Sequence, residues 1–101
     1  GIVICSLIAP YKDSRRAVRN RIEHYGEFVE VFVDTSLEEC ERRDVKGLYA
    51  KARKGLITGF TGIDDPYERP ENPDLIAKTE EASPEELVEA ILDYLKSRAL
   101  I

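Results

Sequence analysis

The chain has 101 residues, of which 43% are hydrophobic and 35% charged, and its formal net charge is −5. This length allows one domain at most, and the hydrophobic content excludes a disordered composition. The acidic balance argues against nucleic-acid binding, and we find neither an apolar run long enough for a membrane span nor a signal-peptide pattern. The cysteines, Cys5 and Cys40, are expected to stay reduced, which favours a cytoplasmic protein.

Two early segments have the composition of buried strands. Gly1–Ile8 is an almost unbroken apolar run with β-branched residues, which is typical of a parallel strand covered on both faces. Pro10 should end it. Phe28–Val33 is the second candidate, with Asp34 at its carboxyl end. Ligands of parallel α/β sheets bind beyond the carboxyl ends of strands, so the turn after Ile8 is placed for binding.

A helix is predicted between these strands, from Asp13 or Ser14 to about Tyr25, with Gly26 closing it. Its expected buried stripe consists of Ala17, Val18 and Ile22. Four arginines lie mostly off that stripe: Arg15, Arg16, Arg19 and Arg21. We favour a solvated face for them, with ligand contact as the alternative.

Two short helices are predicted in the middle of the chain. Ser36 and Glu39 have the spacing of a capping box, which starts a helix ending at about Arg43. Tyr49–Lys54 should form a second one, ended by Gly55.

The chain should end with a loop, a strand and a helix. The loop is Ile63–Pro73, rich in proline and aspartate, and the strand is Asp74–Lys78. Ser83 and Glu86 form a second capping-box pattern, with proline at the first helical position. Apolar residues then recur at helical spacing: Leu87, Val88, Ile91, Leu92 and Leu95. Alternating strands and helices predict an α/β fold, a parallel sheet flanked by helices.

The segment 44–60 carries four cations against one acid, whereas residues 61–75 carry five acids against one arginine. The four cations are Lys46, Lys51, Arg53 and Lys54. Cations beside flexible glycines suit a mobile lid that closes over phosphate or sulfate groups. The alternative is a solvated helix face followed by an ordinary turn.

The motifs DVKGLY at Asp44–Tyr49, KAR at Lys51–Arg53 and GFTGIDDPYE at Gly59–Glu68 closely resemble adenylylsulfate kinase (APS kinase), a family of P-loop kinases. IAPYKDSRRAVRN, at residues 8–20, is similar to the family's ISPYRxxRxxxR segment. Ala9 stands where many members have a serine, sometimes described as a phosphorylated intermediate. Alanine has no hydroxyl, so this chain could use only direct transfer.

The resemblance implies transfer of the ATP γ-phosphoryl group to the 3′-hydroxyl of adenylyl sulfate, giving 3′-phosphoadenylyl sulfate for sulfate assimilation. It assigns adenylyl sulfate contacts to Ile8, Ala9, Lys46, Gly59 and Phe60. Arg43 and the backbone near Ala82 would flank the ATP adenine, and Lys51 and Arg53 would close over phosphates. For Arg43, stabilisation of the dipole of its helix is an equally weighted alternative.

Two motifs of a complete kinase are missing: the phosphate-binding G-x-x-x-x-G-K-[ST] loop and the family's D-G-D-N-x-R. Both belong upstream of Gly1. We therefore expect residues 1–101 to be the C-terminal portion of a kinase domain, including the lid segment 44–62 and inactive alone. Mg²⁺ would be held mainly by upstream residues, and no metal site is expected here.

A second function remains open. Some ATP sulfurylases carry a kinase-like domain that binds the nucleotide and only regulates its partner, and Ala9 also resembles those. The order Lys46, Gly47, Leu48 and Tyr49 resembles the active kinases more closely and favours the catalytic function. As partners we expect ATP and adenylyl sulfate, with either a homodimer or fusion to a sulfurylase.

Overall fold

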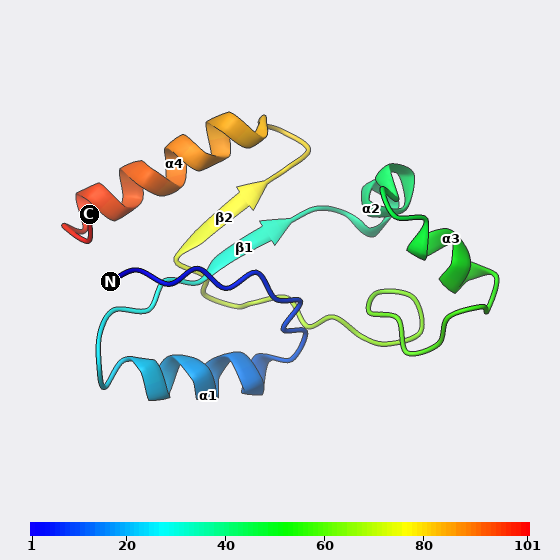
Figure 1. Cartoon of the computed structure of the whole chain (residues 1–101), viewed down its shortest axis with the longest axis horizontal. Coiled ribbons are helices and arrows are strands. Elements are labelled where there is room, and N and C mark those ends of the chain that lie inside the picture. The colour runs from blue at the N-terminus through cyan, green and yellow to red at the C-terminus, as the bar shows by residue number, and fades with distance from the viewer.

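Two parallel strands form the centre of the structure, a computed structural model that describes residues 1–101 (Figure 1). β1 (Val31–Asp34) pairs with β2 (Leu75–Lys78), with Val31 opposite Leu75 and Asp34 opposite Lys78. A parallel pair needs a long crossover, and here the crossover contains two helices. β1 lies within one residue of the predicted end of its strand but begins three residues later than Phe28.

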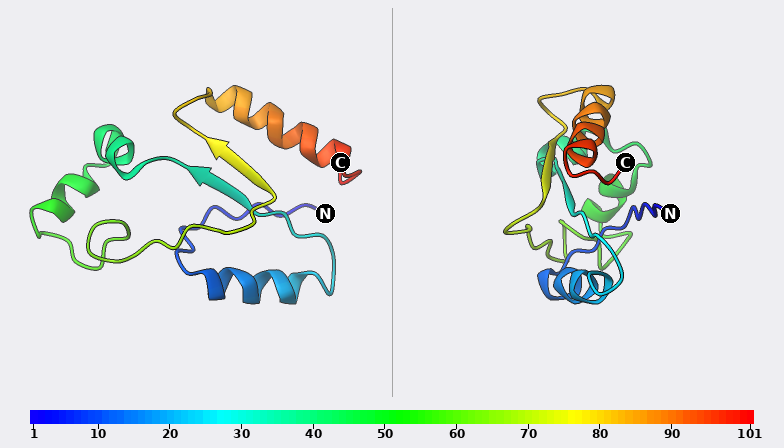
Figure 2. Two further views of the ribbon diagram at one scale, coloured as in Figure 1. Left: turned by 180° about the vertical axis from the view of Figure 1, so that it is seen from behind. Right: turned by 90° about the vertical axis from the view of Figure 1, so that its left-hand side faces the viewer.

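Helices lie around this pair. Figure 1 shows α4 (Pro84–Ser97) alongside β2 and α1 (Lys12–Ile22) beyond β1. α2 (Leu37–Arg43) and α3 (Leu48–Arg53) lie at the end towards which both strands point. In Figures 1 and 2 both ends of the chain lie away from α2 and α3. The α/β prediction, a parallel sheet with helices, is therefore confirmed.

The predicted strand at Gly1–Ile8 does not form. Residues 1–8 make no backbone hydrogen bond, and the apolar side chains of Val3 and Ile4 are 86% and 87% exposed. A strand needs a neighbouring strand to receive its hydrogen bonds, and β1 pairs only with β2. An apolar run of suitable composition therefore remains unpaired in this structure.

α1 differs from its prediction at both ends. It begins at Lys12, where Glu68 Oε1 accepts the backbone N–H at 2.8 Å, and Tyr11 supplies no side-chain cap. It ends at Ile22, three residues before Tyr25. A carboxylate from a distant loop thus takes the capping role predicted for Asp13 or Ser14.

The buried face of α1 is also not the predicted one. The side chains of Arg15 and Arg19 are only 12% and 27% exposed, whereas Ala17, Val18 and Ile22 are exposed. Acidic and carbonyl groups of other segments surround the two guanidinium groups, so burial leaves neither of them unsatisfied. The solvated-face prediction is therefore wrong for these two arginines.

The shorter helices follow the sequence more closely. Ser36 caps α2 by accepting the Glu39 N–H at 3.2 Å, but Glu80, not Glu39, accepts the Ser36 N–H. α4 has both bonds of its predicted capping box, between Ser83 and Glu86. α3 matches its prediction within one residue. None of the helices combines the length and apolar character that crossing a membrane requires.

Candidate functional site

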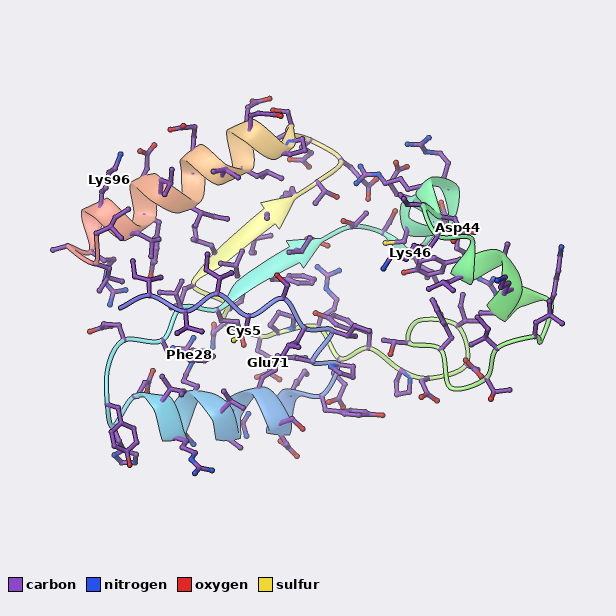
Figure 3. The ribbon with its side chains drawn as sticks, viewed as in Figure 1. Cys5, Phe28, Asp44, Lys46, Glu71 and Lys96 are labelled. Carbon is purple, nitrogen blue, oxygen red and sulfur yellow. The ribbon has the colours of Figure 1, made fainter.

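Asp44 organises the cationic segment. Its carboxylate accepts the backbone N–H groups of Tyr49 at 2.9 Å and Ala50 at 3.1 Å, which caps the amino end of α3. Gly47, with φ of +68°, makes the left-handed turn between them. Figure 3 shows Asp44 and Lys46 together at the α2–α3 end of the molecule, away from Cys5, Phe28 and Glu71.

The predicted lid cations behave differently from one another. Lys46 and Lys51 are exposed and form no ion pair or side-chain hydrogen bond. Arg53 forms a two-pronged pair with Glu41, at 2.6 and 3.0 Å, which joins α3 to α2. The Glu41 carboxylate raises the pKa of Arg53, and Arg53 lowers the pKa of Glu41. The structure thus leaves Lys46 and Lys51 free for an anion and engages Arg53 within the protein.

Gly59 and Phe60 belong to a tight turn closed by Asp64. The Asp64 carboxylate accepts the Gly59 N–H at 2.6 Å and the Phe60 N–H at 2.5 Å. The backbone N–H groups of Phe60 and Gly59 lower the pKa of Asp64. The Phe60 ring, half-buried, meets the Tyr49 ring edge-on with centroids 4.9 Å apart, so the turn is attached to α3.

The turn at Ile8 and Ala9 is held by Arg15. The Ala9 carbonyl accepts a hydrogen bond from Arg15 Nη1 at 2.6 Å, and the Glu68 carbonyl accepts one from Nη2 at 2.5 Å. Glu68 in turn donates its N–H to the Pro10 carbonyl at 2.8 Å. Ala9 adopts a left-handed backbone with φ of +43°.

Arg43 reaches from α2 to the end of β2. Its Nη2 donates to the Thr79 carbonyl at 3.1 Å and its Nε to Glu39 at 2.9 Å. The guanidinium groups of Arg42 and Arg43 lower the pKa of Glu39 to about 2. Ala82 lies in the turn after β2, three residues along the chain from Thr79, which Arg43 contacts. Arg43 also lies in the last turn of α2, as the dipole alternative requires.

The predicted site residues therefore fall into three groups: the Ile8–Ala9 turn, the lid with the Phe60 turn, and Arg43 with the turn before α4. No hydrogen bond, ion pair or ring contact joins Lys46 to Ile8 or Ala9. No cluster of three or more histidine, cysteine, aspartate or glutamate side chains is arranged to hold a metal ion.

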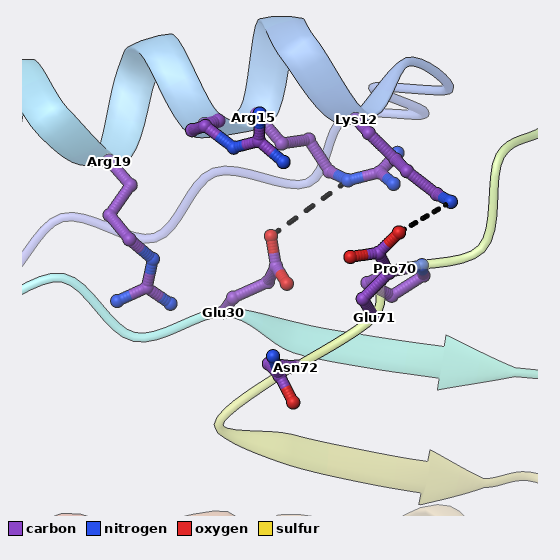
Figure 4. Close-up of a pocket in the computed structure, with 8 residues that line it drawn as sticks. Lys12, Arg15, Arg19, Glu30, Pro70, Glu71 and Asn72 are labelled. Carbon is purple, nitrogen blue, oxygen red and sulfur yellow. Dashed lines mark hydrogen bonds and ion pairs between the residues drawn. The ribbon is translucent and has the colours of Figure 1, made fainter.

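A pocket of about 170 Å³ lies between α1 and the loop before β2 (Figure 4). Its lining contains none of the predicted site residues and consists of Lys12, Arg15, Arg16, Arg19, Glu30, Pro70, Glu71 and Asn72. Lys12 pairs with Glu71 at 3.1 Å, and Arg15 Nε lies 3.9 Å from Glu30. The spacing of Lys12, Arg15 and Arg19 along one helix face is the sequence signal that could have identified this pocket.

Residues 1–78 match the family model described as adenylylsulphate kinase. The chain belongs to the adenylylsulphate kinase family. It is 56% identical to an adenylyl-sulfate kinase of Synechococcus sp. (strain JA-2-3B'a(2-13)), over 99% of this chain and 55% of that protein. It is also 54% identical to the bifunctional enzyme NodQ of Rhizobium tropici, over 96% of this chain and 15% of that protein.

A solved structure agrees with the family assignment. The Mycobacterium tuberculosis APS kinase CysC, in complex with AMPPNP and APS, has a TM-score of 0.80 and 50% identity, covering 89% of this chain and 52% of that chain. The P-loop kinase fold class is thereby confirmed for this partial domain. The chain spans about half the length of the adenylyl-sulfate kinases that it matches.

Proposed function

We propose that residues 1–101 are the C-terminal portion of an adenylyl-sulfate kinase domain, with the lid at residues 44–62. The complete domain would transfer the γ-phosphoryl group of ATP to the 3′-hydroxyl of adenylyl sulfate. Family membership supports this, as does a similar solved structure containing AMPPNP and APS. The observation that carries the proposal is the lid, which presents unpaired lysines beside a turn that holds an aromatic ring.

On the adenylyl sulfate side, Lys46 would meet the anionic phosphosulfate and Phe60 would stack on the adenine. The absence of a side chain at Gly59 leaves the backbone open to the base, while its own N–H is already donated to Asp64. Ile8 and Ala9 would contribute backbone contacts. A charge-assisted bond from an exposed lysine suits the phosphosulfate, because no internal carboxylate competes for the Lys46 ammonium.

On the ATP side, Arg43 and the backbone near Ala82 would flank the adenine. The planar guanidinium of Arg43 is held from one side by Glu39 and from another by the Thr79 carbonyl, which suits it to stacking on a purine. Lys51 would neutralise phosphate charge. Arg53 would do so only by exchanging Glu41 for a phosphate, so we assign it chiefly to bracing α3.

Phosphoryl transfer depends mostly on positioning and charge neutralisation. Ala9 offers no hydroxyl, and a direct transfer between two bound substrates needs none. Mg²⁺, when bound, neutralises charge on the phosphates. No carboxylate cluster among these residues suits that ion, and we propose that residues upstream in the complete domain hold it.

The partners and location belong to the same proposal. Bifunctional relatives named NodQ and CysN/CysC support fusion to a sulfurylase, and a homodimer is the other arrangement that we consider. Two free cysteines suit a cytoplasmic, reducing compartment.

Measurement of ADP release by a complete domain containing this chain would test the activity. We expect ADP release that requires adenylyl sulfate as well as ATP. Nucleotide binding without turnover would instead favour the alternative, a regulatory kinase-like domain of an ATP sulfurylase, for which Ala9 is the supporting observation. Failure to bind adenylyl sulfate at all would contradict both.

A further inference from the structure

Asp64 is an exposed acid whose carboxylate forms two hydrogen bonds within its own turn. Each of its carboxylate oxygens accepts one backbone N–H, Oδ2 from Gly59 and Oδ1 from Phe60. The neighbouring acid, Asp65, has no side-chain hydrogen bond or ion pair. Two adjacent carboxylates thus carry the same charge but make very different contacts.

The backbone of Phe60 is fixed on both sides of its ring. Its N–H is bound by Asp64, and its carbonyl accepts the N–H groups of Ile63, Asp64 and Asp65, each at 3.1 Å. Gly62 donates to the Asp65 carbonyl at 2.7 Å, which closes the same turn. Because the Cα–Cβ direction follows from the backbone, these bonds set the direction in which the aromatic ring leaves the turn.

The ring has only one aromatic neighbour, Tyr49, which it meets edge-on. A single edge contact covers at most one face of the Phe60 ring, and the ring is half-buried. The hydrogen bonds of the turn thus fix the backbone from which the ring projects, and Tyr49 contacts the ring from one side.

We propose that Asp64 is the positioning residue that aims Phe60 at the adenine of adenylyl sulfate, acting through the Gly59 and Phe60 N–H groups. The proposal rests on the proposed function. Asp64 itself touches no substrate in this scheme. Its loss would release two N–H groups to water and allow the turn to rotate, so the stacking platform would be misdirected while the rest of the lid stayed in place.

The test compares Asp64→Ala, Asp64→Asn and the matched control Asp65→Asn in a complete domain, with Phe60→Ala as reference. Calorimetric titration measures Kd for adenylyl sulfate and, separately, for a non-hydrolysable ATP analogue. Asp64→Ala should raise Kd for adenylyl sulfate roughly five- to hundredfold, the range that stacking of one base on an aromatic ring spans. The ATP analogue should bind within about twofold of the unaltered protein, because its site in this scheme lies at Arg43.

The conservative variant separates positioning from charge. An asparagine side chain has one carbonyl oxygen, so Asp64→Asn retains one of the two bonds and should show a smaller loss than Asp64→Ala. Asp65→Asn removes the same charge without a hydrogen bond and should bind like the unaltered protein. Equal behaviour of the Asp64 and Asp65 variants, or equal losses for both nucleotides, would overturn the inference.

A second measurement does not depend on activity. In ¹⁵N-labelled protein the Gly59 and Phe60 amide protons should resonate downfield, as expected for bonds to a carboxylate, and both should move upfield in Asp64→Ala. Unmoved amides would overturn the inference even if affinity fell. If the unaltered protein bound no adenylyl sulfate, the proposed function would fail along with the ligand assigned to Phe60, and the amide shifts would still report whether Asp64 holds the turn.

Discussion

At the scale of single residues, the candidate ligand-binding cations differ in whether they are already paired within the protein. Lys46 and Lys51 are free, Arg53 is paired with Glu41, and Arg43 is shared between Glu39 and Thr79. Lys46, Lys51 and Arg53 are the candidates for binding anionic groups, and only a free cation can meet an anion without first breaking an internal contact. Lys46 and Lys51 are therefore the best candidates for direct contact, and Lys46 is the one proposed to meet the phosphosulfate.

Replacing Lys46 with alanine should lower kcat/KM for adenylyl sulfate roughly ten- to hundredfold in a complete domain, as expected for a lost charge-assisted hydrogen bond of ~1.5–3 kcal/mol. The melting temperature should barely change, because the exposed side chain forms no ion pair or hydrogen bond with the protein. Lys46→Arg should recover part of the rate, since it keeps the charge with different geometry. Lys96→Ala, an exposed lysine on α4 that forms no ion pair, is the control. Unchanged kcat/KM for Lys46→Ala would make this residue an ordinary surface lysine.

At the scale of elements, structural features set by residues close together in the sequence were predicted well, whereas those set by distant contacts were not. Capping at Ser83 and the glycine after α3 depend on residues a few positions apart, and both appear as predicted. The face of α1 depends on Glu30 and Asp74, which are distant in the sequence, so apolar periodicity indicated the wrong side. Similarly, the GFTGIDDPYE motif identified Phe60 as a site residue, but the hydrogen bonds from the Gly59 and Phe60 N–H groups to Asp64 could not be predicted from it.

The ion pair between Arg53 and Glu41 should hold α3 against α2. In Arg53→Ala we expect faster hydrogen–deuterium exchange at the amides of residues 48–54, with little change in α4. Lys51→Ala, on the same helix but without an ion pair, should exchange at the unaltered rate. If the amides of α3 exchange at the same rate in both variants, the ion pair is a surface contact that does not stabilise α3.

Asp74 links three elements, because one carboxylate oxygen accepts the Glu30 N–H and an Arg19 guanidinium bond, each at 2.7 Å. Burial alone would raise its pKa, but the Glu30 N–H and the Arg19 guanidinium outweigh burial and lower it. A lowered folded-state pKa means stability that is complete above the ordinary value of 3.8 and lost as pH falls below it.

Urea denaturation of a complete domain between pH 6 and about 2.5 should therefore show stability falling in the acid range. The Asp74→Asn variant should be less stable at pH 6 and should lose less on acidification. Parallel curves for the two proteins would show that Asp74 does not contribute to the acid sensitivity.

At the scale of the whole molecule, the structure buries very little. Only Phe32, Ala52 and Ala77 are buried, and the molecule extends over 47 × 30 × 23 Å. Large apolar side chains are exposed along residues 1–8 and on α1. Exposed apolar surface of this kind promotes association and gives a weak basis for cooperative folding.

The 101-residue polypeptide on its own should consequently melt over a broad range and bind the dye ANS. It should also show no kinase turnover, because these residues contain no phosphate-binding loop motif. Circular dichroism, dye fluorescence and ADP release would check these three points against a complete domain measured in parallel. A sharp two-state transition, or turnover by the 101 residues alone, would contradict the expectation.

The two free thiols differ in exposure, so their rates of chemical modification can report on the opening of the lid. Cys5 is exposed on the extended first segment, whereas Cys40 is half-buried on α2 beside Tyr49, where burial and the nearby thiol raise the pKa of the Tyr49 hydroxyl. An aromatic thiol reagent should modify Cys5 quickly at all times. It should modify the half-buried Cys40 more slowly, and faster when α2 and α3 separate, so the slower of two reaction phases reports on the opening of the lid without any engineered probe.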